Sequence, residues 1–273
     1  MDDKKDWNQA KKEFAIGNDY VFCRIMKSPE VLTEFIRMCY PNRTFNELLY
    51  VARQHVVEVG KENKSIRMDI KAEDSDGTVY DVEMQNKYQK DNIERRIRYY
   101  AALLDCDTIK PGDAYEFLPD VFIIFVCSFD YKNQGQVIYD FSKRDEYHPS
   151  IQMGDGQHII LLNCTGNGTF PKGDYEKLSH FVQYVHTNIP TDDFTTKIHN
   201  MIAECAKDPA EREDFMEYMD KFWDFRKEIH DKEKEIADSH RLIDEKNKML
   251  SEKDEEILAL RKRVQELEAN RAN

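Results

Sequence analysis

The chain has 273 residues, 40% of them hydrophobic, which is enough for one large domain or for a medium domain with an extension. Its formal net charge of −13 argues against indiscriminate nucleic-acid binding, which needs a basic surface that releases counterions. Twelve basic and thirteen acidic residues in 225–273 leave almost all of this charge to residues 1–224. No run approaches the ~20 apolar residues of a membrane span, and the charged N-terminus lacks an apolar signal region. We therefore expect a cytoplasmic protein without a membrane partner.

Two helices and a strand are predicted before residue 60. The first helix lies in NDYVFCRIMK (18–27) and the second in EVLTEFIRMCY (30–40). Ser28 is a suitable N-cap for the second helix, because Pro29 follows it at the first helical position. The stretch ELLYVARQHVVEV (47–59) is expected to be extended.

The elements that follow predict a mixed sheet flanked by helices. The run DVFIIFVCSF (120–129) is apolar throughout, as in a central strand that is buried on both faces. The other elements are predicted at 65–85 (two strands), 90–105 (helix), 136–141 and 157–163 (strands), and 174–188 and 192–207 (helices). This order is typical of an α/β or α+β domain.

The C-terminal part predicts a long helix. Glycine and proline are absent after residue 209, and apolar residues recur every seven positions at Ile229, Ile236, Ile243, Leu250, Ile257 and Val264. Such a repeat is typical of a coiled coil, and hence of a homo-oligomer. The second core position is polar until Leu260 and Leu267, so the coil is expected to form best after residue 250. The alternative is a single helix that is solvated or folds back on its own domain. We place the boundary between a domain of residues 1–215 and a helix of residues 216–273.

The stretch SIRMDIKAEDSDGTVYDVEMQ (65–85) predicts a β-hairpin with an Asp-Gly turn. Its register matters, because a slip of one residue moves every side chain to the other face. A two-residue loop would set Asp69 opposite Met84. A three-residue loop, with Gly77 in the left-handed conformation, would set Asp69 opposite Glu83.

Alternation favours the three-residue loop, because only this loop keeps the apolar side chains of both strands on one face. That face carries Ile66, Met68, Ile70, Ala72, Tyr80, Val82 and Met84. The other face carries Arg67, Asp69, Lys71, Asp81, Glu83 and Gln85.

Two carboxylates directly opposite each other destabilise a sheet unless a positive charge joins them. At the Cβ separation of about 4.5–5.5 Å that is usual for such a pair, Asp69 and Glu83 can share one divalent ion. Oxygen ligands suit Mg²⁺ or Mn²⁺. The alternative is that Arg67 and Lys71 neutralise the two acids on an open face.

These segments also resemble a known family. NDYVFCRIM resembles an opening helix with an Asp-x-x-Phe pattern, IRMDIKAEDSDGTVYDVEMQ resembles an Asp strand with a Glu-x-Gln strand, and ERRIRYYAALL resembles the helix that follows. The family is the PD-(D/E)XK nuclease superfamily, and within it the bacterial recombination-promoting nuclease (Rpn)/transposase group. The resemblance covers roughly residues 14–225.

The resemblance implies a restriction-endonuclease-like fold and metal-dependent DNA cleavage. Asp69 and Glu83 would hold Mg²⁺ or Mn²⁺, which lowers the pKa of a bound water and stabilises charge on the scissile phosphate. Gln85 stands where the superfamily has lysine; it cannot act as a cation, but it can orient the water or donate to a phosphate oxygen. Asp19 is the candidate for the superfamily's additional helix acid. Its alternative role is the N-cap of the first helix.

The segment after Gln85 is locally basic. Residues 86–98 carry five basic and two acidic side chains, a net charge of +3 in an acidic protein. We expect Lys87, Arg95, Arg98 and Tyr99 to contact DNA phosphates beside the metal site. The last three have helical spacings of three and four residues and can share one face. The alternative is a solvated helix face that is paired with nearby acids.

Two functions follow as hypotheses. The first is a Mg²⁺-dependent DNA endonuclease of a bacterial recombination or mobile-element system. The second is a catalytically weak relative that binds DNA or protein and oligomerises through its C-terminal helix. Gln85 and the acidic domain keep the second hypothesis open.

Overall fold

A computed structural model describes residues 7–57, 66–86 and 92–271. The chain divides into two compact units, Met1–Met216 and Glu217–Asn273, and each is described by itself. The first unit contains the sheet and most of the helices, so it also contains the predicted site. The helix bounds are α1 Trp7–Ala10, η1 Lys11–Glu13, α2 Asp19–Met26, α3 Pro29–Cys39, α4 Ile93–Thr108, η2 Tyr115–Phe117, α5 Glu176–Thr187, α6 Asp193–Cys205 and α7 Pro209–Arg271.

The described residues form a mixed six-stranded sheet in the order β1-β2-β3-β4-β6-β5. Strands β3, β4 and β6 are parallel to one another, whereas β1, β2 and β5 pair antiparallel with their neighbours. The strand bounds are β1 Leu48–Val57, β2 Ile66–Asp74, β3 Val79–Gln85, β4 Val121–Cys127, β5 Ile138–Phe141 and β6 Gln157–Asn163. The predicted α/β architecture with a mixed sheet is confirmed.

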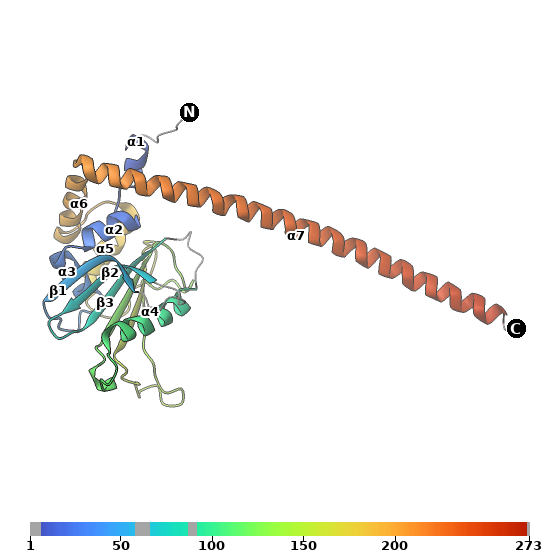
Figure 1. The fold of residues 1–273 in the computed structure, drawn as a ribbon, viewed down its shortest axis with the longest axis horizontal. Helices are drawn as coiled ribbons and strands as arrows, with labels where there is room; N and C mark the ends of the chain where they lie inside the picture. The colour runs from blue at the N-terminus through green and yellow to red at the C-terminus, as the bar shows by residue number, and fades with distance from the viewer. Residues whose placement is uncertain (1–6, 58–65, 87–91, 272–273) are drawn as a thin grey trace. The chain divides into compact units, whose positions relative to one another are not determined.

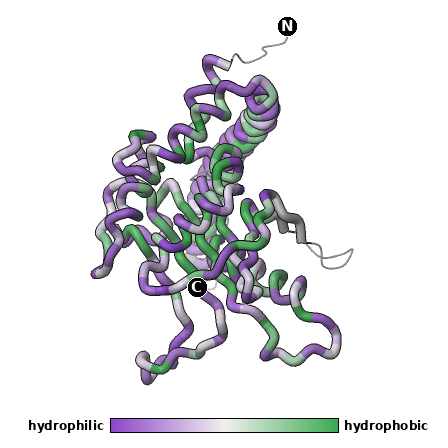
Figure 2. The backbone as a smooth tube through the Cα atoms, turned by 90° about the vertical axis from the view of Figure 1, so that its left-hand side faces the viewer, coloured by the Kyte–Doolittle hydropathy of each residue, from purple (hydrophilic) through white to green (hydrophobic). Residues whose placement is uncertain are grey.

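Strand β4 forms the centre of the sheet, as its sequence predicts. All seven residues of VFIIFVC are buried, because helices cover both faces of the strand and parallel neighbours lie on both sides. Figure 2 shows hydrophobic segments running through the centre of the domain. Strand β3 is also buried along its whole length, although three of its seven side chains are polar. A central strand with this composition is where a functional site is expected.

Helices cover the two faces of the sheet. Helix α4 lies against one face and packs on alternate residues of β4, including Ile123 and Phe125 (Figure 1). Helices α2, α3 and α5 lie on the other side, where Tyr40, at the end of α3, packs against Phe122. The residues of β3 therefore alternate between α4 and the α2–α3–α5 side.

The start of α7 belongs to the first unit. Phe215 is fully buried and contacts the rings of Phe14 and Tyr20 edge to face. Arg24 of α2 forms an ion pair with Glu211 at 2.6 Å. The aromatic packing and the ion pair fix the first turns of α7 to the domain.

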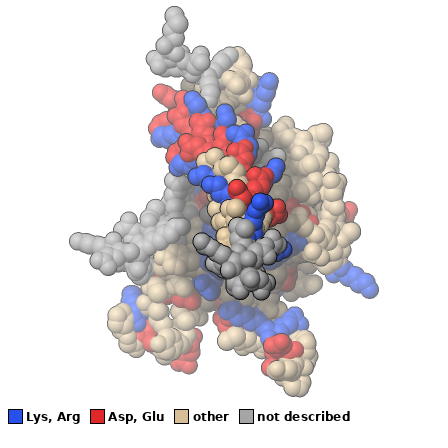
Figure 3. All heavy atoms as spheres, turned by 90° about the vertical axis from the view of Figure 1, so that its right-hand side faces the viewer, with Lys and Arg blue, Asp and Glu red and all other residues tan. Residues whose placement is uncertain are grey.

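The second unit is the rest of α7, which is the long polar helix that the sequence predicts. Lysine and arginine side chains are intermixed with aspartate and glutamate side chains along it (Figure 3). The predicted repeat from Ile236 to Val264 is about half exposed in the single chain, at 48–59% for each residue. Among the described residues, no helix is both long enough and apolar enough to cross a membrane.

Candidate active site

The β2–β3 hairpin has the predicted three-residue loop. Pairing runs from Glu73 opposite Val79 to Ile70 opposite Val82, and the Asp74 N–H donates to the Thr78 carbonyl at 3.1 Å. Gly77 has the left-handed φ of 82° that this loop requires. The predicted loop and its register from Glu73–Val79 to Ile70–Val82 are therefore confirmed.

Beyond the Ile70–Val82 pair, carboxylates replace backbone carbonyls as acceptors between the strands. The Asp69 N–H donates to Glu83 Oε1 at 2.8 Å, and the Met84 N–H donates to Asp69 Oδ2 at 2.9 Å. Buried N–H groups need acceptors, so these contacts fix the orientation of both acids. The predicted pair of carboxylates thus converges at one point between β2 and β3.

The strict alternation of β2 breaks at this point. Met68 was expected on the face of Ile70 and Ala72, but it packs in the apolar cluster under α4. Lys71 pairs with Asp107 of α4 at 2.7 Å, so it is not the partner that was considered for Asp69 and Glu83. The side chain of Arg67 lies outside the described residues.

Arg96 of α4 places a positive charge against Glu83 and Gln85, and the sequence prediction did not select this residue. It forms an ion pair with Glu83 Oε2, and its Nη1 donates to Gln85 Oε1 at 2.6 Å. Its guanidinium carbon lies 5.0 Å from the centre of the Phe125 ring. A sequence signal existed, because Arg96 lies three residues after buried Ile93 and so falls on the inner stripe of the helix.

A third acid, Asp81, lies two residues before Glu83 on the same face of β3. It is fully buried, and neither of its carboxylate oxygens accepts a hydrogen bond from the described residues. Burial and the charge of Asp69 raise the pKa of Asp81 to about 8. Burial and the charge of Asp81 raise the pKa of Glu83 to about 8 as well. Burial, followed by the charge of Glu83, also holds the pKa of Asp69 well above its ordinary value.

Asp19 lies near these acids. Its charge contributes to the raised pKa of Asp69, after burial and Glu83. The alternative role of Asp19 as N-cap is wrong by one residue, because Asn18 caps α2 by accepting the Tyr20 N–H at 3.0 Å. Asp19 is the first helical residue, and its role in the site stays a prediction.

The predicted DNA contacts divide into three groups. Arg95 and Arg98 are exposed on α4. Tyr99 does not share that open face, because it is partly buried against the apolar cluster beneath the helix. Lys87 lies outside the described residues. The helix itself begins at Ile93, three residues later than predicted, with Asn92 as its N-cap.

A comparison of the sequence with family models identifies the family of this chain. Residues 16–166, more than half of the chain, match the model of the PD-(D/E)XK nuclease family transposases. The chain belongs to this family. The matched range contains Asp19, the whole β2–β3 hairpin and α4, so the resemblance predicted from the sequence is confirmed. Comparisons with curated proteins and with solved structures gave no match.

The acids of this family member fit a divalent cation by their chemistry. Asp69 and Glu83 offer carboxylate oxygens, which Mg²⁺ and Mn²⁺ prefer, and the orphaned oxygens of Asp81 lie nearby. No group of three or more His, Cys, Asp or Glu side chains in the described part of the chain is arranged to enclose a metal ion. Mg²⁺ does not need such a cage, because it is commonly held by one or two carboxylates together with water and substrate phosphate.

Asp81→Asn is expected to stabilise the metal-free protein at about pH 9 by on the order of 1–3 kcal/mol, because a neutral amide of similar shape replaces a buried, ionised carboxylate that has no hydrogen-bond partner. The folded protein binds the Asp81 proton more tightly than the unfolded chain does. Its stability therefore falls as pH rises from the ordinary carboxyl pKa of about 3.9 through about 8. Denaturant unfolding in EDTA at about pH 5 and about pH 9 measures this loss of stability. The variant should reduce the loss without abolishing it, because Glu83 and Asp69 also have raised pKa values. Exposed Asp76→Asn is the control, and an equal loss in all three proteins would contradict the prediction.

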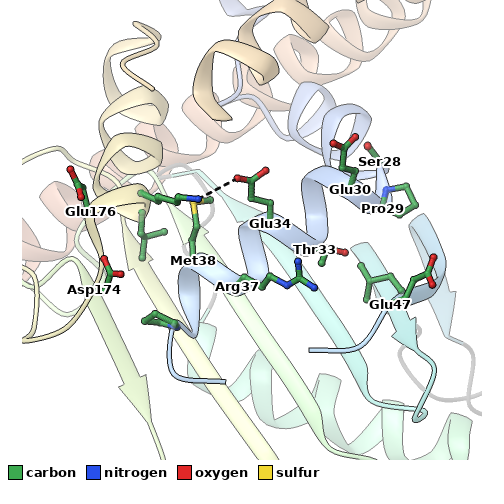
Figure 4. Close-up of a pocket in the computed structure, with 14 residues that line it drawn as sticks. Ser28, Pro29, Glu30, Thr33, Glu34, Arg37, Met38, Glu47, Asp174 and Glu176 are labelled. Carbon is green, nitrogen blue, oxygen red and sulfur yellow. Dashed lines mark ion pairs between the residues drawn. The ribbon is translucent and has the colours of Figure 1, made fainter. Parts of the chain in front are cut away.

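The domain also contains a pocket away from Asp69, Glu83 and Gln85. A pocket of about 870 Å³ lies between α3, the start of β1 and α5, and Figure 4 shows its acidic lining and the ion pair of Glu34 with Lys177. None of the predicted site residues lines it. The site on β2, β3 and α4 is therefore defined by converging side chains and not by this pocket.

Proposed function

We propose that this protein is a divalent-metal-dependent DNA endonuclease of a bacterial recombination or mobile-element system, acting in the cytoplasm. The observation that carries the proposal is the convergence of Asp69 and Glu83 between β2 and β3, with each carboxylate held by a backbone N–H of the opposite strand. Membership of a nuclease and transposase family supports it.

The residues of the chain have separate roles in this proposal. Asp69 and Glu83 would hold Mg²⁺ or Mn²⁺, which supplies an activated water and neutralises charge on the scissile phosphate. Arg96 donates to the amide oxygen of Gln85 and so fixes the orientation of this side chain, to which we assign the role of orienting a water or a phosphate oxygen. Burial of Glu83 and Gln85 excludes bulk water from the inner side of the site.

Helix α4 brings positive charge to the face of the sheet that carries Glu83 and Gln85. Arg95 and Arg98 are exposed on α4, the helix that brings Arg96 to Glu83. Exposed arginines that contact phosphates position DNA without reading its sequence. We therefore propose that Arg95 and Arg98 of α4 contact the phosphate backbone of the DNA substrate, together with Lys87 as predicted from the sequence.

The test is cleavage of supercoiled plasmid by metal-stripped, full-length protein. Nicked and linear products are expected with Mg²⁺ or Mn²⁺, no products are expected in EDTA, and activity should return when excess Mg²⁺ is added. Cleavage that continues unchanged in EDTA would contradict a metal-dependent mechanism.

The second candidate function is an oligomeric binding module with weak catalysis. Gln85 in place of lysine favours it, as does the half-exposed apolar repeat of α7, which we propose joins copies of the chain. The same plasmid assay separates the two functions when it is combined with a gel-shift titration. Binding without metal-dependent cleavage would favour the module.

A further inference from the structure

Both carboxylate oxygens of Glu83 already have a partner in the protein. Its Oε1 accepts the Asp69 N–H at 2.8 Å, and its Oε2 is paired with Nη2 of Arg96. A cation that binds Glu83 must therefore compete with the guanidinium, because both need the same carboxylate charge. Arg96 would otherwise remain beside a metal ion as a second, unneutralised positive charge.

Two orphaned groups lie next to this ion pair. Nε of Arg96 and both carboxylate oxygens of Asp81 are buried without a hydrogen-bond partner in the described residues. Asp81 is on the same face of β3 as Glu83, and its carboxylate feels the Arg96 charge. Buried polar groups without partners are rare in folded proteins, and each needs an explanation. A second state in which Arg96 and Asp81 pair with each other would explain both.

We infer that Arg96 is a positioning residue that alternates between two carboxylates, holding Glu83 in the metal-free protein and moving to Asp81 when Glu83 binds a divalent cation. The inference rests on the metal site of the proposed function. Asp81 makes the exchange feasible, because it gives the guanidinium a buried partner in both states, whereas an unpaired buried charge is strongly unfavourable. Arg96 would thus weaken metal binding in the absence of DNA, and Asp81 would limit that weakening.

Mn²⁺ titration by calorimetry into full-length, metal-stripped protein without DNA tests the exchange. Arg96→Gln should bind Mn²⁺ about tenfold more tightly than the wild type, since the competitor is gone, and Asp81→Asn should bind about tenfold more weakly. In the Arg96→Gln background, Asp81→Asn should have no further effect. Arg96→Lys keeps the charge and should restore weaker binding. Arg37→Gln, which removes one exposed positive charge from α3, should match the wild type.

The possible outcomes separate this inference from the proposed function. Loss of Mn²⁺ binding in Asp69→Asn supports the proposed metal site at Asp69 and Glu83. Unchanged Mn²⁺ binding in this variant would overturn both the metal site and the exchange of Arg96 between Glu83 and Asp81. With the site intact, an unchanged or weaker affinity of Arg96→Gln would overturn the exchange alone. An equal loss from Asp81→Asn in both backgrounds would also overturn it, because Asp81 would then be a ligand itself.

A crystal structure of the wild-type protein with Mn²⁺ provides a test that does not depend on the folding of variants. The guanidinium of Arg96 should lie within hydrogen-bonding distance of Asp81 and away from Glu83. Arg96 still paired with Glu83 beside the bound ion would overturn the inference.

Discussion

Asp69→Asn is expected to lower metal-dependent DNA cleavage by at least about 1000-fold while the protein stays folded. A bound metal contributes several kcal/mol of charge stabilisation, and each 1.36 kcal/mol changes a rate about tenfold. The asparagine keeps an amide oxygen that can accept the Met84 N–H in place of Asp69 Oδ2, so the strand contact survives. It removes the negative charge, and with it the main attraction for a divalent cation. Initial rates of plasmid nicking in Mg²⁺ measure the loss.

The matched control for this variant is Asp76→Asn in the same hairpin. Asp76 is exposed at the turn and accepts a hydrogen bond from Asn46 at 2.7 Å, which an asparagine oxygen can also accept. It should cleave like the wild type, and both variants should have wild-type circular dichroism. Undiminished nicking by Asp69→Asn would mean that the activity comes from another site or from a contaminating nuclease.

The register of the hairpin could be predicted because two independent features agree on it. The apolar residues of β3, Tyr80, Val82 and Met84, alternate strictly with its polar residues, and only one loop length aligns them with Ile70 and Ala72. A glycine stands where that loop needs a positive φ. Since strand periodicity and turn chemistry depend on nearby residues alone, sequence reasoning is reliable for both.

Arg96 and Asp81 were not predicted as site residues because their environment is set by tertiary packing. Arg96 follows buried Ile93 by three residues and so falls on the inner stripe of α4, but the sequence does not show that this stripe faces Glu83 and Gln85. Asp81 was placed on the correct face, but its complete burial depends on β4 and α4 covering it. Met68 was misplaced because the ladder changes its acceptors at Asp69, and alternation is a property of regular ladders.

Replacing Leu250, Ile257, Leu260 and Val264 of α7 by serine is expected to convert an oligomer into a monomer. These side chains are 48–59% exposed in the single chain, and fully burying one Leu, Ile or Val contributes about 1.5–3 kcal/mol. Earlier heptads add little at their second core position, which is lysine or serine at residues 232–253. In the predicted coiled coil, the four apolar residues would therefore contribute most of the association free energy. Sedimentation equilibrium of full-length protein at micromolar concentration measures the mass.

Glu255→Ser with Lys262→Ser is the matched control for the helix, because both positions lie on the opposite face of the repeat and their changes cancel in charge. This control should keep the mass of the wild-type oligomer. The fourfold serine variant is called the seam variant. A wild-type protein that is already monomeric, or a seam variant with the mass of the wild-type oligomer, would contradict the predicted coiled coil. Metal-dependent nicking by a monomeric seam variant would further show that one chain supplies a complete active site. Such a result is expected for single-strand nicking, because Asp69, Glu83, Gln85 and Arg96 all lie in one domain.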